Sequence, residues 1–321
     1  MFECFQTLFL YALSPIHFGA GTAVGPVDSP IQREKHTGWP KANSSSLRGP
    51  LRRWLENGAG WSPKCVEAAF GPEAGGGEGF QGAVGLGDAM VLLFPVRSAR
   101  HVFVYATCPA VLTQFRRRLK DITGEAAKDG VAPPAVPSSA PGPGECWTLG
   151  NGPHEHGRVV LEAFLFTACE KDDSSDLAKW ARWLSTYAFP ESPAYFSKKL
   201  LQDLVLLHDD EFGYFVRRST VVEPHNRIED AAGTVAERGL FYIENLPPET
   251  LLATWVGAST TKAPAKGNGG AFDFKGEDWL KAVRSSLDGK VFQAGGDATT
   301  GRGLLQARFL EPRPAAQGGQ P

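Results

Sequence analysis

The stretch Gln6-Thr-Leu-Phe-Leu-Tyr-Ala-Leu13 is an almost unbroken apolar run, and the fold is organised around it. A run without polar alternation predicts a strand that is buried on both faces. The next regular element begins at Ser44-Ser-Ser46, whose hydroxyls are typical of a helix start. Pro50 lies near the first turn, where proline is tolerated best. The apolar face of this helix has helical spacing and comprises Leu47, Leu51, Trp54 and Leu55.

Two strands and a second helix follow. Met90–Val96 and His101–Thr107 predict the strands. The helix begins at Pro109, and its inner face comprises Leu112, Phe115, Leu119 and Ile122. A strand, a helix, a pair of strands and a helix are the order of a split β-α-β unit. We therefore predict an α+β fold in one domain over residues 1–321, an antiparallel ferredoxin-like or RRM-like sheet that carries long insertions.

The rest of the chain mixes both kinds of element. Val159–Thr167 predicts one strand, and Phe196–Leu207 predicts a helix that follows another at Leu177–Tyr187. Between Gly124 and Gly144, a Pro/Ala/Gly/Ser composition predicts a flexible surface insertion. The chain after Leu207 has a β-rich pattern with one short helix at Trp279–Leu287; its strands are Val221-Val222, Leu240–Ile243, Leu251–Val256, Lys290–Gln293 and Leu304–Phe309.

Composition limits the classes of function. The chain has 33 basic and 35 acidic residues, so a nucleic-acid site must be a local patch. The longest apolar run, Ala89–Val96, is too short for a membrane helix, and no membrane partner is expected. The five cysteines are scattered and never in C-x-x-C spacing, which favours a cytoplasmic location.

One segment is strongly basic. Residues 29–53 hold Arg33, Lys35, Lys41, Arg48, Arg52 and Arg53 against the single acid Glu34. The serine-rich helix start lies inside this segment, and a helix N-terminus offers free N–H groups and a positive dipole end to phosphate. A solvated basic face is the usual explanation of such a run. The combination of hydroxyls, dipole and arginines favours RNA or another polyphosphate.

Two glycine-rich stretches also suggest phosphate contacts. Gly19–Gly25 has one residue too many for a dinucleotide fingerprint, and Pro26 and Pro30 stand where its helix would run. Gly295–Gly303 has Arg302-Gly303 where a P-loop needs Lys-Ser/Thr. Such a loop can still bring backbone N–H groups to a phosphate, with Arg302 as charge partner. An ordinary glycine-rich hairpin is the alternative.

Two residues of the long proline-containing segment 14–43 could do chemistry. Asp28 is a carboxylate among prolines beside the basic segment. It could be a turn former, hold a divalent cation beside a phosphodiester, or organise proton transfer from a ribose 2′-hydroxyl. His17 could act as acid or base, bind RNA, or cap the loop. Spacing alone leaves these alternatives open.

Several motifs resemble RAMP-superfamily CRISPR proteins. They are Leu13-Ser-Pro-Ile-His-Phe-Gly-Ala-Gly21, Val27-Asp-Ser-Pro-Ile-Gln-Arg-Glu-Lys-His-Thr-Gly-Trp-Pro40 and Ser44-Ser-Ser-Leu-Arg-Gly-Pro-Leu-Arg52. Within that superfamily the chain is most similar to the backbone-subunit family of Cmr-type (type III-B) effector complexes. The stretches that indicate this family are Asp88–Ser98, Asp203–Phe212 and Gly239–Glu249.

The resemblance implies a function. Family members have an RRM-like palm, and their copies stack along a CRISPR RNA guide beside the other Cmr subunits. A β-hairpin thumb, here residues 221–245, distorts the paired target RNA. A loop after the first strand, here residues 14–43, carries an aspartate needed for cutting, which is Asp28 by motif position. A divalent metal, Mg²⁺ or Mn²⁺, is then expected at Asp28, with His17 nearby.

The resemblance also implies the positions that contact RNA. They are Gly19, Gly21, Lys41, Ser44, Ser45, Ser46, Arg48, Arg52, Arg53, Arg227, Glu244, Gly295, Gly296, Gly301, Arg302 and Gly303. Two alternatives stay open within the superfamily. The chain could be an RNA-binding filament scaffold that does not cut, or an endoribonuclease that processes CRISPR repeats.

Overall fold

The computed structural model describes residues 1–23, 25–73, 79–124, 131–190, 194–229, 235–262 and 273–311. Among these residues twelve strands form one sheet, and β10 and β11 form a separate pair. Four strands at the centre lie in the order β14-β1-β12-β4, and each neighbouring pair is antiparallel. They are β1 (Cys4–Ala12), β4 (Ala89–Arg97), β12 (Leu251–Ala258) and β14 (Leu304–Phe309).

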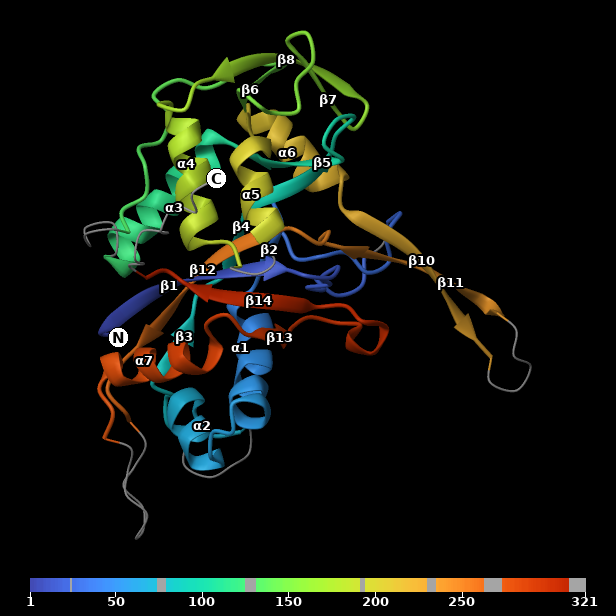
Figure 1. Cartoon of the computed structure of the whole chain (residues 1–321). Coiled ribbons are helices and arrows are strands. Elements are labelled where there is room, and N and C mark those ends of the chain that lie inside the picture. Colours follow the sequence, from blue (N-terminus) through green and yellow to red (C-terminus); the bar gives the residue numbers. More distant parts are fainter. Residues whose placement is uncertain are drawn as a thin grey trace.

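This centre has the topology of a β-α-β-β-α-β palm. The helix α1 (Ser44–Arg53) connects β1 to the β3–β4 strand, and α7 (Gly276–Leu287) connects β12 to β14. Both helices lie on the same side of the sheet (Figure 1). β3 (Val84–Leu86) continues β4 along β12 after a break. The predicted ferredoxin-like or RRM-like α+β fold is confirmed.

The large insertion between β4 and β12 builds a second lobe on the same sheet. Its strands follow β4 in the order β5-β9-β6-β8-β7, with β5–β9 and β6–β8 parallel. They are β5 (Phe103–Thr107), β6 (Glu145–Leu149), β7 (Arg158–Leu161), β8 (Phe164–Lys171) and β9 (Leu204–Leu207). Its helices are α3 (Pro109–Arg118), α4 (Asp176–Tyr187), α5 (Ala194–Asp203) and α6 (Asp209–Arg218). Three further elements of the palm side are β2 (Lys41–Ala42), α2 (Pro63–Phe70) and β13 (Val291–Gln293).

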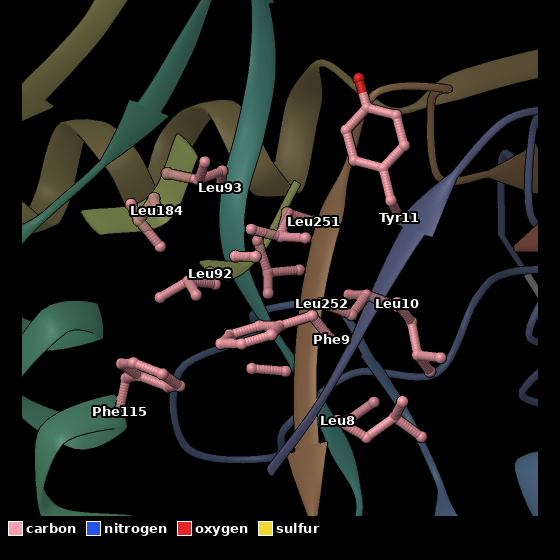
Figure 2. Packing of buried hydrophobic residues seen from close by; sticks show 14 of the residues in the cluster. Leu8, Phe9, Leu10, Tyr11, Leu92, Leu93, Phe115, Leu184, Leu251 and Leu252 are labelled. Carbon is pink, nitrogen blue, oxygen red and sulfur yellow. The ribbon is translucent and has the colours of Figure 1, made fainter. Parts of the chain in front are cut away.

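The palm and the second lobe share one hydrophobic core. Phe9 of β1 is fully buried and packs on Phe115 of α3 and Trp183 of α4, with ring centroids 5.8 and 6.1 Å apart. Figure 2 shows Phe9 near Leu252 of the neighbouring strand β12 and Leu92 of β4, the strand beyond it. Because β1 is covered on both faces, its apolar run has no alternation, as the sequence indicates.

A long hairpin stands away from this body. β10 (Val221–Ile228) pairs with β11 (Val235–Asn245), and the pair projects from the side of the molecule (Figure 1). Its outer half exposes apolar side chains, among them Ile228, Val235 and Leu240. No helix in the described ranges combines the length and apolarity that crossing a bilayer requires.

Several predicted elements are wrong in detail. The helix predicted over Phe196–Leu207 ends at Asp203, and Leu204–Leu207 is a strand between β5 and β6. Val159–Thr167 is divided between the hairpin strands β7 and β8. The region predicted as β-rich contains α6, and Pro50 is the seventh residue of α1 rather than part of its first turn.

Part of the stretch Gly124–Gly144, which its composition predicts as a flexible insertion, is bonded to the second lobe. Residues 125–130 lie outside the described part, but Val131 and Ala135 are bonded to α4. The Trp183 Nε1–H donates to the Val131 carbonyl at 3.1 Å, and the Trp180 Nε1–H donates to the Ala135 carbonyl at 2.9 Å. Val131 itself is buried. Indole donors from a distant helix hold this segment, and local composition cannot reveal them.

The turn between β11 and β12 carries a carboxyl group that lies against two tyrosines. The Tyr11 hydroxyl donates to Glu249 Oε2, and the Tyr105 hydroxyl donates to the same oxygen at 3.3 Å. Glu249 has a left-handed backbone, with φ 70°. Burial raises its pKa from the ordinary 4.5 to about 7.

This carboxyl should make stability depend on pH. The folded protein holds the proton of Glu249 more tightly than the unfolded chain, so stability falls as pH rises from about 4.5 to about 7 and then levels off. The Glu249→Gln variant should lack this decline, a difference of about 1–2 kcal/mol because the carboxyl is only partly buried. Thermal midpoints of both proteins from pH 5 to 8 measure it. Glu162→Gln, at a glutamate with φ 53°, is the control and should follow the wild type.

Candidate functional site

Three segments meet at the base of the hairpin: the loop 14–43, the end of β11, and the glycine-rich loop Gly295–Gly303 (Figure 1). Ile16 and Leu246 exchange backbone hydrogen bonds of 2.9 and 2.8 Å. The Gly296 N–H donates to the His17 carbonyl at 2.8 Å, and the Gly303 N–H donates to the Pro15 carbonyl at 2.9 Å. The two loops that the sequence singled out are therefore joined directly.

His17 lies at this junction with one ring nitrogen fixed. Its Nδ1 is 2.7 Å from the Glu244 carbonyl oxygen, which can only accept, so Nδ1 carries a proton. In the neutral ring Nε2 then has a lone pair, and it makes no hydrogen bond to any described residue. A Cβ on Gly19 would lie 2.8 Å from Nε2, and one on Gly296 would lie 3.1 Å from Cδ2. Glycine at both positions lets the loops close around the ring.

Asp28 is held against the outer edge of β11. Its Oδ2 accepts the Tyr242 N–H at 2.8 Å, while the side chain stays exposed. The next residue continues the pairing, because the Ser29 N–H donates to the Tyr242 carbonyl at 3.1 Å and the Glu244 N–H donates to the Ser29 carbonyl at 3.0 Å. Asp28 and His17 therefore bind backbone groups two residues apart, about 7 Å along a strand.

Glu244 is not placed to contact RNA, which corrects the prediction made for it. Its side chain is 8% exposed, and its carboxylate accepts from the Arg33 guanidinium, from the Ile31 N–H at 3.0 Å and from the Thr220 hydroxyl at 2.7 Å. These contacts clamp the loop 14–43 to the hairpin. Arg227, the other predicted hairpin residue, is exposed.

Arg302 likewise has a protein partner. Its guanidinium is paired with Glu223 of β10, and its side chain is 17% exposed. A phosphate contact of Arg302, which stays a prediction, would have to replace or share this pairing with Glu223. Gly295 and Gly303 permit close packing, since a Cβ there would lie 2.6 Å from the His17 carbonyl oxygen and 2.2 Å from the Ala294 carbonyl oxygen. Gly21 and Gly301 are open to solvent.

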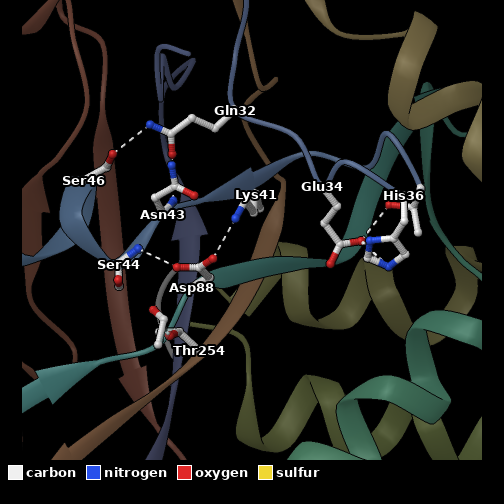
Figure 3. A network of polar contacts seen from close by, with 11 residues as sticks. Gln32, Glu34, His36, Lys41, Asn43, Ser44, Ser46, Asp88 and Thr254 are labelled. Carbon is white, nitrogen blue, oxygen red and sulfur yellow. Dashed lines mark hydrogen bonds and ion pairs between the residues drawn. The ribbon is translucent and has the colours of Figure 1, made fainter. Parts of the chain in front are cut away.

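The N-terminus of α1 is partly occupied by a carboxylate of the protein itself, that of Asp88 (Figure 3). Asp88 Oδ1 accepts the Ser44 N–H at 2.8 Å, and Oδ2 accepts the Lys41 ammonium at 2.7 Å. Burial alone would raise the pKa of the Asp88 carboxyl, but its bonds to Lys41 and Ser44 outweigh burial and hold that pKa below its ordinary value. The Ser44 N–H and the Lys41 ammonium are therefore already paired within the protein, and RNA contacts of these two residues stay a prediction.

The other serines and arginines of the basic segment differ in whether their side chains are already hydrogen-bonded within the protein. Ser46 Oγ accepts a hydrogen bond from Gln32, whereas Ser45 is exposed and its hydroxyl makes no hydrogen bond within the described residues. Arg48 donates to the Phe70 carbonyl, and Arg52 donates to the Gly71 carbonyl at 2.9 Å. Arg53 is exposed. The phosphate contacts predicted here rest on Ser45, Arg53 and the outer parts of Arg48 and Arg52.

A divalent ion finds only part of a coordination shell on the protein. No group of three or more His, Cys, Asp or Glu side chains in the described ranges is arranged to hold a metal. Asp28 offers one exposed carboxylate oxygen beyond the one bonded to Tyr242. Mg²⁺ is commonly held by one or two carboxylates together with substrate phosphates. The donor set thus fits an ion shared with RNA.

Comparison with known proteins identifies the family. The RAMP superfamily matches residues 9–306, and the chain belongs to it. The curated relative "CRISPR system Cmr endoribonuclease Cmr4" of Pyrococcus furiosus is 32% identical over 302 residues, which are 94% of each chain. The crystal structure of oligomeric Cmr4 from P. furiosus has a TM-score of 0.69 at 26% identity, with 97% of this chain and 99% of that one covered.

A more distant structure shows the same fold. The cryo-EM structure of the type III-B Cmr-beta complex bound to cognate target RNA contains a chain with a TM-score of 0.67 at 17% identity. The match covers 96% of this chain and 98% of that one. The similarity to the Cmr-type backbone-subunit family that the motifs indicate is thus confirmed over nearly the whole chain.

Proposed function

We propose that this chain is the backbone subunit of a type III-B CRISPR effector complex and cuts target RNA paired with the guide. The observation that carries the proposal is that Asp28 and His17 of the loop 14–43 both bond to backbone groups of β11, two residues apart, at the base of the projecting hairpin. The name of the P. furiosus relative, an endoribonuclease of 32% identity, supports the activity. The Cmr-beta structure with target RNA supports the fold that holds it.

The chemistry that suits this site is transfer of the phosphodiester to the neighbouring 2′-oxygen. The 2′-hydroxyl loses its proton to a base, the 2′-oxygen forms a bond to phosphorus, and the bond to the 5′-oxygen breaks. His17 Nε2 is the base that the Nδ1 contact with Glu244 leaves available. The 5′-oxygen takes up a proton as it leaves. The products are a 2′,3′-cyclic phosphate and a 5′-hydroxyl.

Asp28 supplies negative charge next to the reacting groups. Its free carboxylate oxygen would hold Mg²⁺ or Mn²⁺ together with RNA phosphate oxygens. When bound, such an ion stabilises the charge that develops on the phosphate oxygens. The hairpin that carries both anchoring points would position the ribose, since alignment of the three reacting atoms accounts for much of the rate.

The contacts proposed for RNA suit a subunit that must accept any guide. Ser45, Arg48 and Arg53 can bind phosphates, which carry no base information. Sequence is then chosen by base pairing between guide and target. The oligomeric crystal form of the P. furiosus relative supports stacking of copies. In such a stack, each copy would bring its own Asp28 to the target at a regular interval.

The test is cleavage of a labelled complementary RNA by the chain assembled on a guide with its complex partners. We expect cuts at regular intervals, products with 2′,3′-cyclic phosphate ends, and loss of cutting in EDTA that Mg²⁺ or Mn²⁺ restores. Target binding without any cutting would identify a scaffold instead. Cutting of free CRISPR repeat RNA by the isolated chain would identify a guide-processing enzyme.

A further inference from the structure

Gln32 occupies the point where the loop 14–43 meets the start of α1 (Figure 3). Its Nε2 donates to the Gly19 carbonyl at 2.9 Å and to Ser46 Oγ at 2.8 Å. Its Oε1 accepts the Asn43 N–H at 2.7 Å. Both amide hydrogens and the carbonyl oxygen of the side chain are therefore in use.

The backbone of Gln32 adds two more connections to the same place. Its N–H donates to the Phe18 carbonyl at 2.7 Å, and its carbonyl accepts the Lys41 N–H at 3.0 Å. One residue thus joins the outgoing limb of the loop, the returning limb and the helix start. Leucine or methionine has a similar length but could make only the two backbone bonds.

The part of the loop that Gln32 holds, around Gly19, lines the candidate active site. Gly19, whose carbonyl it binds, lies directly against His17 Nε2. Between Gly19 and Gln32 the chain carries Asp28, and the two limbs are paired by a bridge between Gly19 and Ile31. A displacement of Gly19 would therefore move the ring and the carboxylate relative to α1.

We propose that Gln32 is a positioning residue, which couples the guide-binding start of α1 to the loop that carries His17 and Asp28. The inference rests on the proposed function and extends it, because none of the groups that Gln32 contacts reacts with RNA. The ring of His17 and the carboxylate of Asp28 are fixed on β11 at one end. Gln32 fixes their loop to the palm at the other. A misplacement of about 1 Å in such an arrangement can cost about 100-fold in rate.

The strongest alternative is that Gln32 only stabilises α1. Gln32→Glu separates the two roles. A carboxylate still accepts the Asn43 N–H and can accept from the Ser46 hydroxyl, so the link to the helix stays. It cannot donate to the Gly19 carbonyl, so the link to the active-site wall is lost. A helix-stabilising role predicts wild-type cutting by Gln32→Glu, whereas a positioning role predicts slow cutting.

The experiment uses the assembled complex with guide and measures single-turnover cutting, guide affinity and amide hydrogen exchange of Ala20 and Ala23. These N–H groups bond to the Pro30 and Asp28 carbonyls across the loop. In Gln32→Leu and Gln32→Glu we expect a 10- to 100-fold slower rate, guide affinity within about threefold of wild type, and faster exchange of both amides. Gln306→Ala is the control. The Gln306 side chain also donates to a backbone carbonyl, that of Gly289, but it makes no hydrogen bond to the loop 14–43 within the described residues.

The outcomes separate this inference from the proposed function. Wild-type rates in both Gln32 variants, together with inactive Asp28→Ala, would reject the positioning role and leave the nuclease intact. Full cutting by Asp28→Ala would reject the nuclease assignment itself. A loss of guide affinity as large as the loss of rate would show that Gln32 supports the fold of α1 and nothing more.

Discussion

Asp28→Ala, assembled on guide RNA, should bind a complementary target with nearly wild-type affinity and cut it at least about 100-fold more slowly. The carboxylate is exposed at the base of the hairpin, and one of its oxygens is free. Removing a group that takes part in proton transfer or charge stabilisation typically costs 10²- to 10⁴-fold. Affinity should change little, because the contacts expected to carry binding are made by other residues.

Asp28→Asn sharpens this result. Its amide oxygen can still accept the Tyr242 N–H, so the loop stays pinned to β11 while the negative charge is removed. If charge is what matters, Asn should be as slow as Ala, and single-turnover rates at saturating target decide this. Asp210→Ala, at a side chain that is 95% exposed outside the site, is the matched control. Undiminished cutting by Asp28→Asn would assign Asp28 the role of a loop anchor.

The palm could be predicted from sequence because its signals are local. The unbroken apolar run of β1 reflects burial on both faces, and the serines before Leu47 mark a true helix start. The strand β9 could not be predicted, because Leu204–Leu207 is equally compatible with the end of a helix. Its pairing with β5 and β6 decides its conformation, and those partners lie far away in sequence.

In the candidate site, too, local signals could be predicted from sequence and distant partners could not. His17 and Asp28 belong to motifs that can be read in one stretch of chain. The partners that give the site its geometry cannot be found in this way. Glu244 is paired with Arg33 across 211 positions, and Asp88 reaches Ser44 across 44. A glutamate on a β-hairpin has the same local pattern whether it faces RNA or a buried arginine, so its predicted role is wrong.

Glu244→Ala should have the largest combined effect on stability and cutting. It leaves the Arg33 guanidinium, the Ile31 N–H and the Thr220 hydroxyl without their acceptor. Removing one partner of a buried ion pair typically costs about 3–5 kcal/mol. Because the Arg33 side chain is 22% exposed, we expect about 2–4 kcal/mol here. Cutting should fall at least about 30-fold, since the loop that carries Asp28 loses its clamp.

A double-mutant cycle shows whether the clamp acts as a unit. Arg33→Ala alone leaves a buried carboxylate with two neutral donors, so it should also destabilise the protein. Arg33→Ala with Glu244→Ala removes both charges, and its loss of stability should be smaller than the sum of the single losses. Thermal unfolding of the four proteins measures the coupling, and target cleavage by the same four shows whether position or charge matters. If the double variant regains stability but not cutting, the ion pair holds the loop in its active position. Strict additivity would instead mean that Glu244 and Arg33 act separately and do not form one clamp.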